Sequence, residues 1–153
     1  MGVLSKETVN FTALLTFVIE GVEYCVNNGI VTSIIEPDKI YNLPTTSALK
    51  YSLLRVGKKI IPLLDLKKIF RGEEQKINSL TRVIIIEYKE TQFGLLVEKA
   101  KELIAADSDS LRTSGKFILE ENDIHFTEGT LKLGNKELLF LNIDKIIKQI
   151  AYF

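Results

Sequence analysis

The chain has few of the residues on which catalytic and metal sites depend. Its 153 residues include one cysteine, one histidine and no tryptophan, and the formal net charge is zero. A single cysteine excludes an internal disulfide. A lone histidine, with no cysteine or second histidine to join it, offers no metal-ligand set and no nucleophile system. The balanced charge excludes the basic surface that is typical of proteins that bind nucleic acid or anionic membranes.

Long apolar runs and phosphate-binding motifs are also missing. No stretch approaches the roughly 20 apolar residues that cross a bilayer, so we expect no direct membrane insertion. Gly57 stands alone before two lysines, outside any P-loop or dinucleotide pattern. The carboxylates are best explained as solvated faces and helix caps. The lone Cys25 and the absence of a signal-peptide pattern favour the cytoplasm. We therefore expect a cytoplasmic protein that is not an enzyme and needs no metal or cofactor.

What the chain does contain is a series of short β-prone runs. Residues 1–10 are polar and aperiodic, which predicts a flexible leader. Apolar runs separated by polar turns then predict hairpins, at residues 11–26, 53–64, 82–97 and 125–141. Residues 98–106 fit a helix or a strand equally well. The sequence therefore predicts a mainly β protein with short helices.

The hairpin at residues 53–66 organises the rest of the chain. Its second arm, residues 60–64, is apolar at nearly every position, and such a strand is expected to be covered on both faces. Pro62 cannot donate to a strand ladder, which predicts a barrel closure, a bulge or a strand switch at that point. Asp65 is predicted to open a short helix.

A weak internal repeat connects this hairpin with the end of the chain. Residues 60–70 and 137–147 share an apolar strand, an Asp or Asn cap, and a basic amphipathic turn of helix. The repeat predicts two similar small barrels, each closed by a hairpin and a short helix. With no convergent polar groups in the sequence, recognition of other proteins by edge pairing or groove filling is the expected activity.

Several segments resemble the CheW-like domain of bacterial chemotaxis. The resemblance rests on their order and spacing along about residues 11–151: residues 17–26, Ile-Ile-Pro-Leu-Leu-Asp-Leu at 60–66, Phe-Gly-Leu-Leu-Val-Glu at 93–98, Glu-Gly-Thr-Leu-Lys-Leu at 128–133, and Leu-Leu-Phe-Leu-Asn-Ile-Asp-Lys at 138–145. It implies an all-β fold in which residues 11–151 form one CheW-like domain. That domain would be made of two intertwined five-stranded SH3-like β-barrels and a C-terminal helix.

The resemblance also implies a non-catalytic adaptor that couples the cytoplasmic tip of a chemoreceptor to the regulatory domain of a CheA-type histidine kinase. The residues it suggests for the receptor side are Val31, Ser33, Arg55, Gly57 and Lys58. Those suggested for the kinase side are Phe93, Leu95 and Val97. Ordinary core positions, or solvated turn positions at Arg55 and Lys58, are the competing interpretation.

The chain departs from the family at two of these positions. Ser33 and Gly57 stand where the family has a glutamate and an arginine that can pair. Losing both charges together avoids leaving one of them unpaired. Two alternatives stay open at this point: a docking module without a receptor or in another two-component system, such as gliding or pilus control, and a small-ligand-binding β-barrel.

Overall fold

The structure is a computed structural model that describes residues 11–37, 40–41, 52–107, 111–112 and 126–151. The predicted leader and His125 lie outside these residues. The elements are β1 (Phe11–Ile19), β2 (Val22–Asn27), η1 (Asn28–Ile30), β3 (Val31–Ile35), β4 (Ile40–Tyr41), β5 (Ser52–Val56), β6 (Lys59–Asp65), α2 (Leu66–Arg71), β7 (Arg82–Tyr88), β8 (Thr91–Val97), β9 (Lys99–Asp107), β10 (Leu111–Arg112), β11 (Thr127–Leu133), β12 (Lys136–Leu141) and α4 (Ile143–Ala151). The prediction of a mainly β protein with short helices is confirmed, and the ambiguous residues 98–106 form a strand.

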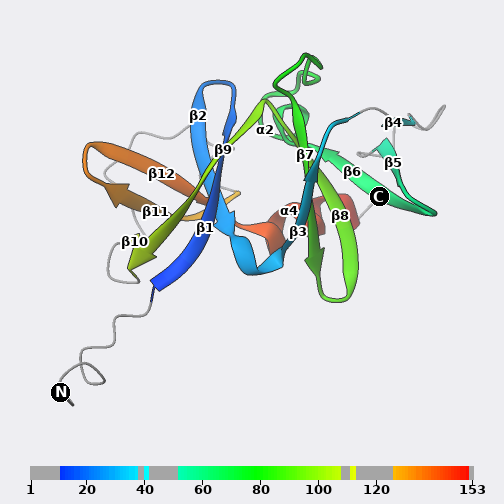
Figure 1. Ribbon diagram of the computed structural model, residues 1–153. Coiled ribbons are helices and arrows are strands. Elements are labelled where there is room, and N and C mark those ends of the chain that lie inside the picture. Colours follow the sequence, from blue (N-terminus) through cyan, green and yellow to red (C-terminus); the bar gives the residue numbers. More distant parts are fainter. Residues whose placement is uncertain (1–10, 38–39, 42–51, 108–110, 113–125, 152–153) are drawn as a thin grey trace.

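The strands form two sheets, which we call the first and the second lobe (Figure 1). The first lobe has the strand order β10-β11-β12-β2-β1-β9, and the second has the order β3-β7-β8-β6-β5-β4. Each sheet consists of five longer strands and one two-residue strand at its edge, β10 or β4. The predicted pair of five-stranded SH3-like units is therefore confirmed. None of the helices in the described ranges is long and apolar enough to cross a membrane.

The two lobes exchange one strand each. β3 follows β2 along the chain but pairs with β7 in the second lobe, and β9 follows β8 but pairs with β1 in the first. The two sheets have the same strand arrangement when each is read from its exchanged strand. The first lobe then reads β9-β1-β2-β12-β11-β10 and the second reads β3-β7-β8-β6-β5-β4. In both lobes the fourth strand of this order runs parallel to the third and leads into a helix, α2 or α4. The predicted repeat is therefore a repeat of the whole sheet, and the exchange makes the lobes intertwined.

Strand β6 gains a second neighbour along its length. It pairs antiparallel with β5, where Leu53 stands opposite Pro62, and it runs parallel to β8 from Leu63 onward. Pro62 therefore lies directly before the second edge of β6 becomes paired, in the part of the strand that has a neighbour on one edge alone. The strand does not switch partners at this point, because Leu63 pairs with both Ser52 and Gly94. The expectation of cover on both faces is wrong for Ile60, which is 62% exposed. The outer face of the hairpin extends beyond the elements that cover it.

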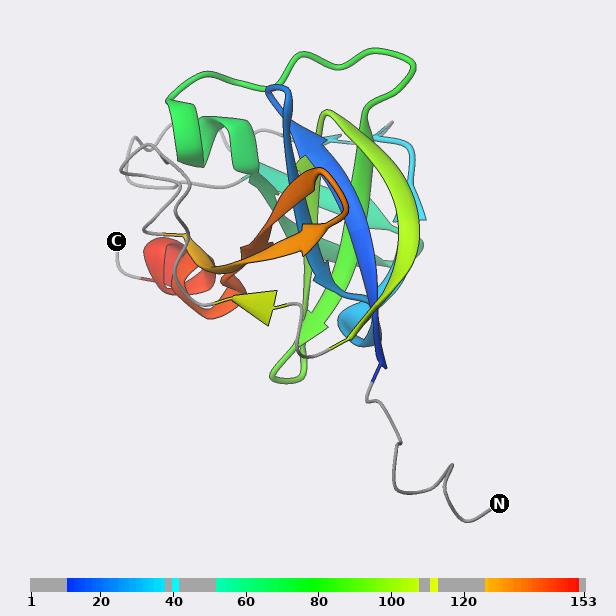
Figure 2. The same ribbon diagram turned by 90° about the vertical axis from the view of Figure 1, so that its left-hand side faces the viewer.

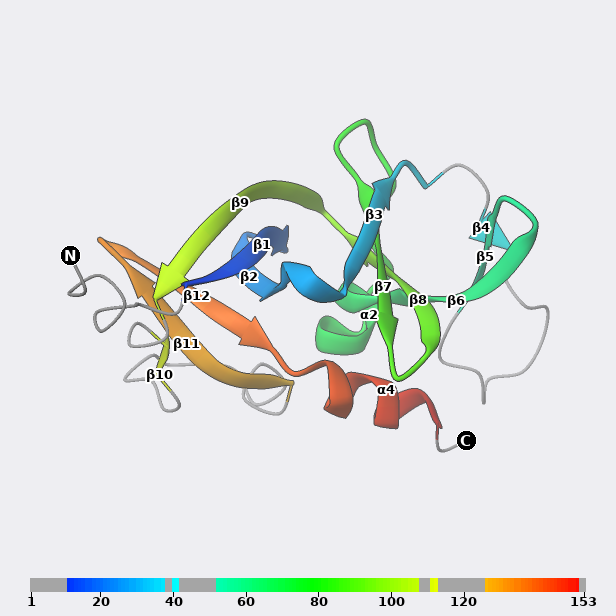
Figure 3. The ribbon, with the colours of Figure 1, turned by 60° about the horizontal axis from the view of Figure 1, so that its bottom comes forward.

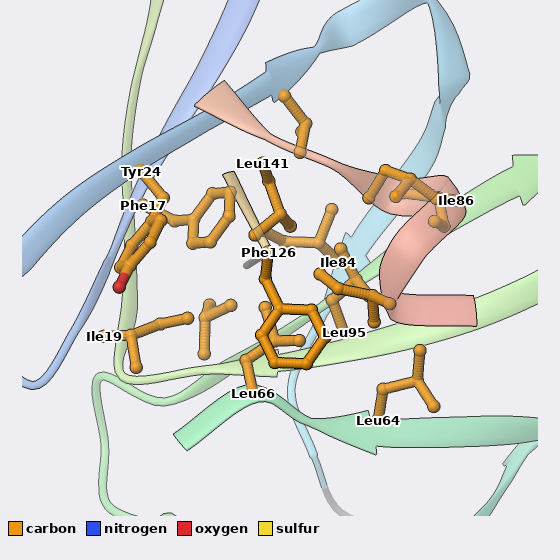
Figure 4. Close-up of a cluster of buried hydrophobic side chains, with 14 of the residues drawn as sticks. Phe17, Ile19, Tyr24, Leu64, Leu66, Ile84, Ile86, Leu95, Phe126 and Leu141 are labelled. Carbon is orange, nitrogen blue, oxygen red and sulfur yellow. The ribbon is translucent and has the colours of Figure 1, made fainter. Parts of the chain in front are cut away.

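Apolar side chains pack into three clusters. One fills the second lobe, one fills the first, and the largest lies between them and is called the inter-lobe core here (Figure 4). On β7, Ile84 and Ile86 point into the inter-lobe core while Val83 and Ile85 point into the second lobe. Side chains alternate between the two faces of a strand, so a strand covered on both sides is apolar at every position. This arrangement accounts for the continuous apolar run of residues 83–86.

Candidate functional site

Reactive groups do not converge in the described part of the chain. No cluster of three or more histidine, cysteine or acidic residues is present there to hold a metal ion. Cys25 is fully buried, and burial raises the pKa of its thiol to about 12, with the Glu128 carboxylate adding to the effect. A thiol with so high a pKa is a poor nucleophile at neutral pH. The surfaces of the molecule are therefore its candidate functional features.

The three residues suggested for the kinase side are packed in the core. Leu95 and Val97 are fully buried in the inter-lobe core, and Phe93 packs there with them. Their strand, β8, lies between β7 and β6, so both its edges are paired. The interpretation that these side chains contact a partner is corrected by this burial. They help to hold the two lobes together instead.

The receptor-side residues Val31 and Ser33 lie on opposite faces of β3. Val31 stands opposite Ile86 and packs against the inter-lobe core, whereas Ser33 stands opposite Ile85 and is exposed. The register shifts between them, and the hydroxyl of Thr32 donates to the carbonyl of Ile85 at 3.3 Å. A β-bulge adds one residue to a strand and so turns the following side chains to the other face. The bulge thus separates two residues that the sequence groups together.

Arg55, Gly57 and Lys58 form the exposed tip of the β5–β6 hairpin. Gly57 has φ of 62°, a conformation that glycine adopts without strain, so the turn itself accounts for glycine here. The Arg55 Nε donates to the carbonyl of Gly57 at 3.3 Å. Strands β3 and β5 lie toward opposite ends of the sheet order, and Figure 3 shows the tip extending away from β3. The predicted receptor residues therefore occupy two places on the surface.

Two exposed aliphatic residues on the exchanged strands were not among the site residues predicted from the sequence. Ile34 on β3 stands opposite Ile84 and is 42% exposed, and Leu103 on β9 stands opposite Leu15 and is 59% exposed. Both Ile84 and Leu15 belong to the inter-lobe core. Directly paired residues share a sheet face. Ile34 and Leu103 therefore continue the inter-lobe core to the surface, one from each lobe.

We call Val31, Ile34 and Leu103 the inter-lobe face. In Figure 1 the strands that carry them, β3 and β9, lie on the two sides of the junction between the lobes. Because β9 fits a helix as well as a strand in sequence, only the pairing of β9 with β1 shows that Leu103 belongs to this face. The hydrophobic periodicity of the sequence alone cannot assign Leu103 to this face.

Polar contacts also join the lobes. Glu20, in the turn between β1 and β2, lies 3.8 Å from the Lys67 Nζ and 3.7 Å from the Arg71 Nε of α2. Figure 2 shows this turn and α2 at the same end of the molecule. At another point of the junction, the Tyr88 hydroxyl donates to Asp144 on α4 at 2.8 Å. Contacts of this kind add modestly to the apolar packing but fix its geometry. The two lobes are therefore joined by polar contacts as well as by the shared apolar core.

Comparison with known proteins agrees with this architecture. The family model for the CheW-like domain matches residues 13–151. The chemotaxis protein CheW of Bacillus subtilis is 22% identical over 134 residues, which cover 88% of this chain and 85% of that protein. CheW of Thermotoga maritima is 26% identical over 126 residues, covering 79% and 78% of the two chains.

A solved structure gives the same result. The scaffolding protein TtCheW from Thermoanaerobacter tengcongensis superimposes with a TM-score of 0.74 at 25% sequence identity, covering 85% of this chain and 88% of that one. The two-lobed fold, the segment order noted in the sequence and the family match over residues 13–151 agree. The chain belongs to the CheW-like domain family.

Proposed function

We propose that this chain is a non-catalytic adaptor of chemotaxis signalling. It couples the cytoplasmic tip of a chemoreceptor to the regulatory domain of a CheA-type histidine kinase. The observation that carries the proposal is the inter-lobe face, where each of the two exchanged strands places an exposed aliphatic side chain over a shared core. Relatives named as chemotaxis and scaffolding proteins support this role.

The inter-lobe face is the surface we assign to the receptor. Ile34 and Leu103 offer apolar contact from both lobes, and the half-buried Val31 joins them to the core. An apolar surface of this kind suits the apolar side of a helical partner. Ser33 is exposed on the other face of β3 and is assigned to the rim of the contact.

The packing of the lobes supports an adaptor over a ligand-binding barrel. Each lobe has its own core of aliphatic side chains, represented by Leu54 and Leu63 in the second lobe and by Leu14 and Leu138 in the first. A ligand-binding barrel instead keeps an enclosed cavity with a few converging polar groups. Packed interiors leave the outer surfaces to carry the function.

Binding measurements with partners from the same organism test the proposal. The full chain is titrated with a purified receptor-tip fragment and, separately, with the kinase regulatory domain. The double variant Ile34→Asp/Leu103→Asp should weaken receptor binding by about tenfold or more, because it places charges in an apolar contact. The control Ile77→Asp/Leu80→Asp alters two other exposed aliphatic residues, which are 54% and 58% exposed, and should bind like the wild type. If the wild-type chain binds neither partner, alone or together, the adaptor function is wrong.

A further inference from the structure

The connection from the first lobe to the second contains the only asparagine of the chain that is followed by glycine. Asn28 and Gly29 belong to η1, which lies between β2 of the first lobe and β3 of the second. The side-chain amide of an asparagine can be attacked by the backbone nitrogen of the next residue. Glycine in that place hinders the attack least, because it has no Cβ. This dipeptide is therefore a chemically reactive point of the backbone.

The reaction at such a dipeptide is an intramolecular deamidation. The Gly29 nitrogen would form a bond to Cγ of Asn28, and the side-chain NH₂ group would leave with the proton of the Gly29 amide as ammonia. The product is a cyclic imide. Water then adds to either ring carbonyl and breaks its bond to the nitrogen, which leaves aspartate or isoaspartate. Water is the only co-reactant, and nothing is oxidised or reduced.

The structure holds the reactive peptide group on both sides. The Gly29 N–H donates to Oδ1 of Asn27 at 2.7 Å, and the carbonyl of Asn28 accepts from the Val31 N–H. Ring closure requires the Gly29 nitrogen to lose its proton and to turn toward the Asn28 side chain, so the peptide group has to leave these bonds. Hydrogen-bonded amides release their protons only when the structure opens locally. The Asn27 side chain therefore opposes the reaction of its neighbour.

Glycine itself allows Asn27 to come so close. A Cβ atom at residue 29 would lie 3.0 Å from Oδ1 of Asn27. Gly29 does not have the positive φ of Gly21 or Gly57, so the backbone conformation alone does not call for glycine here. The residue that makes Asn28 reactive is thus also the one that admits the protecting side chain.

The position of η1 makes a change at Asn28 consequential. η1 contacts β1 of the first lobe and β7 of the second, and Ile30 and Val31 directly after the dipeptide pack against the inter-lobe core. Isoaspartate carries the backbone through the side-chain carbon and so adds a carbon atom to the chain. The added atom would lie in the segment that sets β3 against β7.

We propose that Asn28 is a deamidation site that the Asn27 side chain keeps latent in the folded protein. Loss of the hydrogen bond between Asn27 and Gly29, or local opening of η1, releases the reaction. The inference goes beyond the adaptor function and does not depend on it, because the chain reacts without a partner.

Mass spectrometry of peptides from the incubated full chain tests the proposal. At mildly alkaline pH, Asn28 should deamidate about tenfold or more slowly in the folded wild type than in the urea-unfolded chain. Asn27→Ala removes the cap and should raise the rate in the folded chain about fivefold. Asn27→Asp keeps an accepting oxygen and should react no more than about twofold faster than the wild type.

A matched control separates the cap from overall stability. Oδ1 of Asn142 accepts from the Lys145 amide at 3.1 Å, so Asn142→Ala removes an asparagine cap from another helix. It should leave the rate at Asn28 within about twofold of the wild type. Hydrogen exchange should become faster at the Gly29 amide in Asn27→Ala, with the amides of β7 unchanged. Circular dichroism confirms that each variant is folded.

Incubation followed by thermal melting tests the consequence for the fold. Asn27→Ala should lose melting temperature as isoaspartate accumulates. Asn27→Ala/Asn28→Gln should keep its melting temperature, because the longer glutamine side chain closes a less favourable ring.

The other outcomes overturn the inference. Equal rates at Asn28 in the folded and the unfolded wild type would show that the fold gives no protection. An equal acceleration by Asn142→Ala would assign the effect to global stability, and an unfolded chain that does not deamidate at Asn28 would remove the site. None of these results bears on the adaptor function, which partner binding tests separately.

Discussion

The Tyr88 hydroxyl donates a hydrogen bond of 2.8 Å to the Asp144 carboxylate, 56 residues further along the chain. Tyr88 ends β7 in the second lobe, and Asp144 lies in the first turn of α4, which follows the last strand of the first lobe. Lys148 contacts the same carboxylate at 2.9 Å and Lys89 at 3.4 Å. These contacts join α4, which follows a strand of the first lobe, to the second lobe.

This contact predicts a loss of stability in acid. Hydrogen bonds from Lys148 and Tyr88 lower the pKa of Asp144 from 3.8 to about 2. Because the pKa is lower in the folded chain than in the unfolded one, the stabilisation is complete above pH 3.8 and is lost as the pH falls through about 2. Urea unfolding of the wild type and of Asp144→Asn should therefore differ most above pH 4 and converge near pH 2. A difference between them that does not depend on pH would contradict this assignment.

Removal of the Asp65 side chain should loosen the end of the central hairpin. Its carboxylate accepts from the Lys68 amide at 3.1 Å and from the Gln75 amide at 2.8 Å, so it caps α2 and also anchors the connector that follows. Burial raises the pKa of Asp65, and the amide donors counteract this effect. We expect Asp65→Ala to lower the free energy of unfolding by about 2 kcal/mol. In Asp65→Ser the cap is kept and only the Gln75 contact is lost, so an intermediate value is expected.

Gly94 is required by close packing inside the second lobe. A Cβ atom at this position would lie 2.9 Å from Val83 Cγ1 and 3.1 Å from Leu63 Cδ1. Both neighbours belong to the core of that lobe. Gly94→Ala should destabilise the protein by about 1–3 kcal/mol in thermal or urea unfolding, because the extra methyl group overpacks the core. The double variant Gly94→Ala/Val83→Ala should lose less than the sum of the two single changes, and strict additivity would argue against a clash.

The shared core predicts that the two lobes unfold together. Phe70 on α2 packs against Tyr24 of the first lobe, with ring centres 5.3 Å apart, and against Phe126, with ring centres 5.4 Å apart. Phe70→Ala should lower the free energy of unfolding by about 3–5 kcal/mol. Far-UV circular dichroism and tyrosine fluorescence should report one coincident transition in the wild type. Two separate transitions in the wild type would show that each lobe is stable alone.

Local rules were sufficient for the individual elements. Gly57 and the two lysines after it predicted the hairpin tip, and Asp65 predicted the start of α2, because turn geometry and helix capping depend on residues close together in sequence. Pro62 lies in the part of β6 that has a neighbour on one edge alone, which agrees with its missing N–H for an equally local reason. The repeated strand-cap-helix pattern also indicated two similar lobes.

The same patterns did not distinguish a buried face from an exposed face. Leu95 and Ile60 both lie in apolar runs, yet Leu95 is fully buried between the lobes while Ile60 is mostly exposed. Burial depends on which distant strands cover a face, and that depends on the exchange of β3 and β9. The bulge between Val31 and Ser33 had a similar effect, since it turned neighbouring positions to opposite sides.

By itself, the sequence determined the β class, the order of the hairpins, the two helix caps and the resemblance to the family, because these depend on composition and on contacts between near neighbours. Only the tertiary structure decided which apolar side chains are core and which are surface. It buried Phe93, Leu95 and Val97, and it left Ile34, Leu103 and Ile60 exposed. The physical reason is that the exposure of a side chain is a property of the packed sheets, whose pairing joins residues that are far apart in the chain.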